Sequence, residues 1–182
     1  MALAIFCATT MYVSAQDFNF GLKAGVNFAS LNGDDIDDLD GVTGLHIGAV
    51  AEFGLSEKFS IQPELIYSTQ GASLDDETLK LDYINIPVLA KYYIIEGLSL
   101  EAGPQLGFNI NSEYEFDGET EDEEGVNTID IAAGLGAGYK LPVGIFFQAR
   151  YNIGLTDVYE EIQGFQIDAK NNVFQISVGY MF

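Results

Sequence analysis

The chain contains few residues whose side chains could carry out catalysis. Its only histidine, His46, falls on the polar face of a segment in which apolar and polar residues alternate. A Ser-His-acid hydrolase embedded in a membrane would need its triad close to the lipid. A lone histidine on the polar face therefore predicts a hydrogen-bonded interior residue. The glycines of Gly134-Leu135-Gly136-Ala137-Gly138 share one face and precede no predicted helix, which favours room-making for side chains over a phosphate loop. We therefore expect no enzymatic activity and no cofactor.

Carboxylates are the most abundant ionisable groups, and many of them gather in two acidic segments, Asp34 to Gly41 and Asp117 to Gly125. Hard cations bind to clusters of oxygen atoms, but neither segment has the spacing of a calcium-binding loop. A solvated anionic loop is the leading interpretation. The alternative is weak Ca²⁺ or Mg²⁺ binding that bridges lipopolysaccharide phosphates, and its candidate ligands are Asp35, Asp37, Asp40, Glu119, Glu121 and Glu123.

The balance of charge excludes one class of partner. The 182 residues include 28 Asp and Glu against 7 Lys and Arg, which gives a formal net charge of −21. Proteins that bind nucleic acid need a basic surface for the phosphates, so nucleic acid is not an expected partner. With 10 Tyr, 13 Phe and 20 Gly, the composition favours strands and turns over helices.

The first fifteen residues, MALAIFCATTMYVSA, have the apolar core and small-residue end of a secretory signal peptide. Val13-Ser14-Ala15 predicts cleavage before Gln16. The only cysteine, Cys7, falls within this segment, so the mature chain would have neither a disulfide nor a thiol nucleophile. We expect residues 1–15 to be the signal peptide and residues 16–182 to form one domain.

After the leader, apolar and polar residues alternate in eight segments. Successive residues of a strand point to opposite faces, so each segment predicts a strand with one apolar and one polar face. These segments begin at residues 18, 44, 59, 84, 98, 129, 145 and 174. No later segment offers the roughly 20 apolar residues of a membrane helix, whereas barrel strands need only alternate apolar residues. The sequence predicts an all-β fold, an eight-stranded antiparallel up-and-down transmembrane β-barrel in the outer membrane of a Gram-negative bacterium.

The predicted connections alternate in length and charge. Short links follow the second, fourth and sixth strands at Ser56-Glu57-Lys58, Ile95-Glu96-Gly97 and Leu141-Pro142-Val143. Long links follow the first, third, fifth and seventh strands and hold most of the acidic residues, with eight carboxylates between Glu113 and Glu124. Short periplasmic turns and long outer loops give a membrane barrel this asymmetry.

The polar face of the strands distinguishes a membrane barrel from a soluble one. It is dominated by Gly, Asn, Gln and Ser, whereas the exterior of a soluble barrel would carry many Lys and Glu side chains. Four bases and four acids also lie on it, and buried charges need partners. We therefore expect a neutralised charge network in the interior, formed by Lys23, Glu52, Glu64, Lys91, Glu101, Asp130, Lys140 and Arg150. Two alternatives stay open: a narrow pore, and a soluble lipocalin-like barrel that binds a ligand.

The last strand ends on an aromatic residue. Phe174, Ile176, Val178, Tyr180 and Phe182 alternate up to the final residue. This run resembles the terminal signal by which outer-membrane barrels are delivered to the assembly machinery. We therefore expect that machinery, outer-membrane lipid and lipopolysaccharide as partners of a monomeric barrel.

Four motifs carry a resemblance to a known family. They are Phe20-Gly21-Leu22-Lys23-Ala24-Gly25-Val26-Asn27, Gln62-Pro63-Glu64-Leu65-Ile66-Tyr67-Ser68, Ile84-Asn85-Ile86-Pro87-Val88-Leu89-Ala90-Lys91-Tyr92 and Gly103-Pro104-Gln105-Leu106-Gly107. The chain resembles the PorT-like outer-membrane β-barrel domain family of the Bacteroidota, among the small OmpA- and OmpX-like barrels. The resemblance implies the fold and the outer-membrane location. From the loops and the missing catalytic groups, we expect a non-enzymatic structural or interaction role at the cell surface.

Overall fold

The computed structural model describes residues 18–33, 40–74, 77–116, 119–122, 125–159 and 168–182. The predicted signal peptide, residues 1–15, lies outside this part of the chain. No described helix is long and apolar enough to cross a membrane. The strands are β1 (Phe18–Asn32), β2 (Asp40–Ser56), β3 (Phe59–Leu74), β4 (Glu77–Ile95), β5 (Leu98–Phe116), β6 (Glu119–Asp122), β7 (Ile129–Lys140), β8 (Ile145–Gly154) and β9 (Lys170–Met181).

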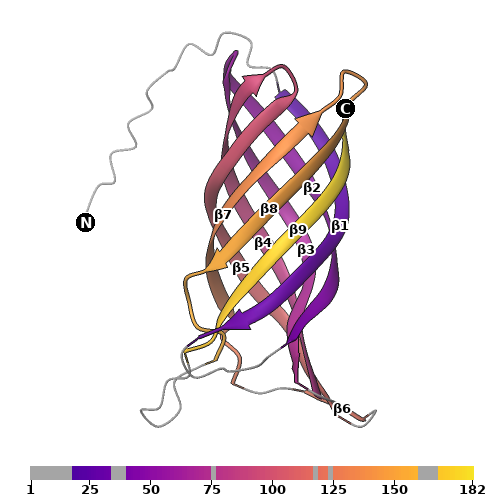
Figure 1. Ribbon diagram of the computed structural model, residues 1–182, viewed down its shortest axis with the longest axis vertical. Helices are drawn as coiled ribbons and strands as arrows, with labels where there is room; N and C mark the ends of the chain where they lie inside the picture. Colours follow the sequence, from indigo (N-terminus) through magenta and orange to yellow (C-terminus); the bar gives the residue numbers. More distant parts are fainter. Residues whose placement is uncertain (1–17, 34–39, 75–76, 117–118, 123–124, 160–167) are drawn as a thin grey trace, which may run out of the picture.

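These strands form one antiparallel sheet that closes on itself (Figure 1). Around the ring the order is β4-β3-β2-β1-β9-β8-β7-β5, and β4 pairs with β5 to complete it. The first and last strands meet with Phe28 opposite Phe174, and β4 meets β5 with Ile84 opposite Phe108. The short strand β6 is not part of the ring, and it pairs with β5 alone. The structure thus confirms the predicted eight-stranded up-and-down barrel.

The apolar rows of the strands face outward and the polar rows face inward. Along β8, Phe147 and Tyr151 are exposed, whereas their neighbours Gln148 and Arg150 are buried. A soluble barrel has the opposite arrangement, because water covers its outside and apolar side chains fill its inside. The soluble lipocalin-like alternative is therefore wrong.

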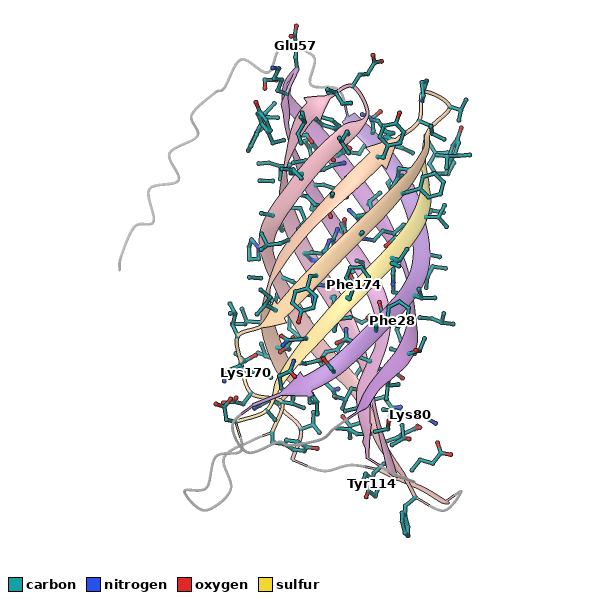
Figure 2. All side chains as sticks on the ribbon, viewed as in Figure 1. Phe28, Glu57, Lys80, Tyr114, Lys170 and Phe174 are labelled. Atoms are coloured by element: carbon teal, nitrogen blue, oxygen red, sulfur yellow. The ribbon has the colours of Figure 1, made fainter. Side chains whose placement is uncertain are left out.

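Aromatic side chains pair at two levels of the outer surface. Near the short turns, Phe18 lies 5.1 Å from Phe53, and Phe20 lies 6.0 Å from Phe182, measured between ring centroids. Toward the opposite end, Phe28 and Phe174 are 6.3 Å apart (Figure 2). Aromatic girdles of this kind flank the lipid-facing band of membrane barrels.

The two ends of the barrel differ. Three short turns, β2–β3, β4–β5 and β7–β8, lie at the end that carries Glu57, where both termini of the barrel also lie. Gly97 and Gly144 adopt φ angles of 83° and 92° in two of these turns, a backbone region that favours glycine. Lys80, Tyr114 and Lys170 lie at the other end (Figure 2).

At that second end the strands run further than the sequence predicts. β3 continues to Leu74, β4 begins at Glu77, and these two residues pair with each other. Paired strand residues therefore occupy most of the long link that the sequence predicts there. In the segment predicted as one loop from Glu113 to Glu124, Glu113 pairs with Asp122 across β5 and β6. The ladder persists because inward Ala72, Leu79 and Leu81 pack together, so these strands need no lipid to bury them.

Candidate functional site

A closed ring of hydrogen bonds and ion pairs fills the middle of the barrel. Lys23 Nζ lies 2.8 Å from Glu64 Oε2, and Arg150 holds both Glu64 oxygens through Nη1 and Nη2 at 2.9 and 2.7 Å. Arg150 Nε donates to Glu101 at 3.1 Å. Gln148 completes the ring, since it donates to Glu101 and accepts from Lys23, each at 2.7 Å. Strands β1, β3, β5 and β8 are therefore linked across the lumen.

A second ion pair extends this ring toward the short turns. Lys91 Nζ lies 3.1 Å from Glu52 Oε2 and 2.9 Å from Gln62 Oε1. Gln62 in turn donates to Glu64 at 2.6 Å, and Ser60 and Tyr93 donate to Glu52. Three bases and three acids are thus joined in one network. Arg150 is 1% exposed, so solvent does not supply its partners.

Two of the eight predicted interior charges lie apart from this network. Asp130 accepts a hydrogen bond from Thr156 at 3.0 Å. Lys140, at the other end of β7, lines a depression of about 660 Å³ at the short-turn mouth, together with Glu52, Ser60 and Tyr93. The alternation of the sequence marks which residues face inward, but it does not specify which of them meet across the ring.

The histidine is held in a hydrogen-bonded chain. His46 Nδ1 lies 2.8 Å from Asn27 Oδ1, and His46 Nε2 lies 2.8 Å from Ser177 Oγ. The order Ser177–His46–Asn27 has the connectivity of a hydrolase triad. However, all three side chains are buried, and Asn27 also bonds to Gln175 and Ser68. The burial and the additional hydrogen bonds fit an interior packing role.

Inward apolar side chains pack together toward each end of the lumen, which the sequence analysis did not predict. At the loop end, a cluster of inward residues packs against Val126 and Tyr159; it consists of Leu31, Ala72, Leu79, Leu81, Tyr83 and Val158. At the turn end, Val50, Phe146 and Met181 pack together. The alternation contained the signal, because Leu79, Leu81 and Tyr83 continue the inward row of β4 past its polar part.

The structure describes the predicted assembly signal, but it does not describe the side chains of the predicted metal ligands. Asp35, Asp37 and Glu123 lie outside the described residues, as do the side chains of Asp40, Glu119 and Glu121. No group of three or more His, Cys, Asp or Glu in the described part of the chain could hold a metal ion. The five residues of the terminal run, from Phe174 to Phe182, are all exposed on the outer surface.

The loop end carries an exposed basic group among acidic ones. Lys170 bonds to Asp168 and lies 3.4 Å from Asp157. Its hydrogen bond to Asp168, together with the negative charges of Asp157 and Asp168, raises the pKa of Lys170. Charged groups therefore reach solvent beyond the apolar band at the end distal to the short turns.

A family comparison agrees with this geometry. The model of the outer membrane protein β-barrel domain matches residues 14–160. The chain belongs to the outer membrane protein β-barrel domain family. The family and the outward apolar face together place it in the outer membrane, with its strands crossing the lipid.

Solved structures share the fold of this outer membrane protein. Neisserial surface protein A aligns with 90% of this chain and 97% of its own, with 12% identity and a TM-score of 0.64. Ail, the attachment invasion locus protein of Yersinia pestis, was solved in complex with the heparin analogue sucrose octasulfate. It aligns with 91% of this chain and 99% of its own, with 15% identity and a TM-score of 0.58. A search of curated proteins gives no match. At these identities the likeness shows the fold alone.

Proposed function

We propose that this outer-membrane barrel is a non-enzymatic structural or interaction protein that presents acidic loops at the cell surface. The observation that carries the proposal is the filled lumen, where buried ion pairs span the ring and inward apolar clusters pack toward both ends. An eight-stranded barrel is only wide enough for side chains to fill. Contacts with partners are then left to the loops.

The charge of the loops indicates the kind of partner. Acids of the long connections outnumber bases, and the segment from Glu113 to Glu124 alone contains eight carboxylates. Ail shares the fold and is solved with a polyanionic ligand. This chain has a formal net charge of −21 and would repel such a ligand, so we favour cationic partners. Divalent cations between lipopolysaccharide phosphates and Asp35, Asp37, Asp40, Glu119, Glu121 and Glu123 are one form of that contact.

The finer assignment and the route to the membrane belong to the same proposal. The motifs of β1, β3, β4 and β5 support the PorT-like branch of the family found in Bacteroidota. Residues 1–15 would direct export. The exposed run from Phe174 to Phe182 would be recognised by the assembly machinery, which would deliver a monomer to the membrane.

The orientation is tested with single cysteines at the two ends. The mature chain would contain no other cysteine, and both Phe116 and Glu57 are exposed. A membrane-impermeant maleimide should label Phe116→Cys on intact cells and Glu57→Cys only after lysis. Labelling of Glu57→Cys on intact cells would invert the orientation and remove the acidic loops from the surface.

The role of the charge is tested by exchanging the eight carboxylates between Glu113 and Glu124 for amides. The variant barrel should still fold, shown by a faster band on unboiled gels, and should lose binding of a polylysine probe to cells. Unchanged polylysine binding would contradict the proposal, as would lipid hydrolysis or acylation by the purified wild-type barrel.

A further inference from the structure

Polar side chains without partners lie on the inner wall where β4, β5 and β7 meet. The Nδ2 and Oδ1 atoms of Asn85 and the Oε1 atom of Gln105 have no hydrogen-bond partner in the described structure. Asn85 is 1% exposed and Gln105 is 4% exposed. Buried polar groups are nearly always paired, so a group of unpaired ones requires a physical explanation.

One of the unpaired oxygens, Asn85 Oδ1, borders a glycine that lies beside a buried carboxylate. Asn85, Gly107 and Asp130 stand side by side on the three strands. A Cβ atom at Gly107 would lie 2.7 Å from Asn85 Oδ1 and 3.3 Å from Asp130 Cβ, so both side chains border the space left by the glycine. Gln105 follows two positions along the same inward row of β5, flanked by Gly103 and Gly107.

Asp130 has no basic counterpart nearby. Lys23, Lys91 and Arg150 already balance Glu64, Glu52 and Glu101. No base in the described part of the chain lies within ion-pair distance of Asp130. Lys140 is ten residues further along β7, about 33 Å at the rise of an extended strand. One negative charge of the interior is therefore uncompensated.

The surroundings of Asp130 make such a charge costly. Tyr83 lies two positions from Asn85 on the inward face of β4 and belongs to the apolar cluster at the loop end. This cluster therefore borders the site on the side of the loop end. An unpaired carboxylate in such a place is expensive unless a proton or a cation neutralises it. A proton would let Asp130 donate to one of the unpaired oxygens and would leave the other without a partner.

We propose that this site binds a monovalent hard cation of the Na⁺ or K⁺ type. The Asp130 carboxylate, Asn85 Oδ1 and Gln105 Oε1 would supply its protein ligands, because alkali and alkaline-earth ions prefer carboxylate and carbonyl oxygens. Asn85 Nδ2 would bond to a water that remains on the ion. A single positive charge neutralises the one uncompensated acid, whereas a divalent ion would leave an excess.

The experiment compares thermal unfolding of the refolded barrel in detergent at matched ionic strength. NaCl or KCl should raise the Tm of the wild type above its value in choline chloride, because the large choline ion does not fit the site. The Asp130→Asn variant should lose this difference. The control Asp82→Asn removes an acid from the outward face of β4 at the same end and should keep it. Equal Tm values in sodium and choline for the wild type would overturn the proposal.

A second measurement does not depend on a variant folding. Wild-type crystals grown in thallium(I) acetate should show an anomalous peak between the side chains of Asp130 and Asn85. Water alone at that position, without an anomalous peak, would overturn the cation site and leave the proposed surface function intact, since the cysteine labelling tests the latter separately.

Discussion

Arg150 links two buried carboxylates that lie on different strands. It bonds to both oxygens of Glu64 and to Glu101, and it is 1% exposed. A buried pair is a weak source of stability compared with apolar packing, but removing one partner leaves an uncompensated charge. The role of Arg150 is therefore to keep two buried carboxylates neutralised, and its loss should be felt throughout the ring.

Arg150→Met should lower the free energy of unfolding by about 3–5 kcal/mol, because Glu101 loses its cation and Glu64 retains only Lys23. Urea unfolding in detergent micelles, followed by far-UV circular dichroism, measures this change. The matched control is Lys170→Met, which removes a half-exposed pair at the loop end and should leave the free energy of unfolding nearly unchanged. Equal losses of unfolding free energy in the two variants would contradict the view that Arg150 is needed to neutralise buried carboxylates.

Residue identity predicts the inward set but not its pairing. The strict alternation identifies Lys23, Glu64, Glu101 and Arg150 as neighbours of the lumen, since a strand has a period of two. Which acid meets which base depends on the register and tilt of strands far apart in the chain. Gln148, which closes the ring, has no charge to mark it in the sequence.

At the scale of elements, the alternation of apolar and polar residues does not predict the strand ends that extend beyond the lipid-facing band. Outward residues alternate cleanly inside the membrane band, and all eight ring strands were predicted there. Beyond the band, β3, β4 and β5 are held by cross-strand pairing and by the apolar cluster around Leu81. The many acidic residues of these extensions favour a loop in the sequence analysis. The contacts that stabilise them come from other strands and cannot be seen in the local sequence.

Two glycines on β7, Gly136 and Gly138, allow a matched pair of variants that test how tightly this strand packs. A Cβ at Gly136 would lie 2.6 Å from the Ala149 carbonyl oxygen and 2.9 Å from Glu101 Oε1. At Gly138 the nearest atom would be Ser99 Oγ at 3.3 Å. Gly136→Ala should therefore lower the free energy of unfolding by about 1–3 kcal/mol, through overpacking.

The Gly138→Ala control lies on the same face two residues away. Its free energy of unfolding should stay within about 0.5 kcal/mol of the wild-type value in a urea titration, as is usual for substitutions that disrupt no packing or hydrogen bond. If both variants lose stability equally, the close contacts at Gly136 do not explain the loss, because Gly138 lacks them.

At the scale of the whole molecule, the barrel is a filled cylinder with an apolar outer surface and a charged loop end. Lipid covers the outer surface, the ring around Arg150 occupies the middle, and inward apolar clusters pack toward the two ends. Solvent-borne partners are thereby limited to the loops. The narrow pore requires the opposite, a continuous water path along the lumen.

The filled lumen is tested most directly by current across a planar lipid bilayer. Refolded wild-type protein, whose faster band without boiling demonstrates a closed barrel, is inserted and held under voltage. We predict no discrete current steps above the lipid background. Steps whose conductance changes in Arg150→Met or Glu101→Gln would contradict the account, because they would place the ion path through the side chains that are here assigned to block it.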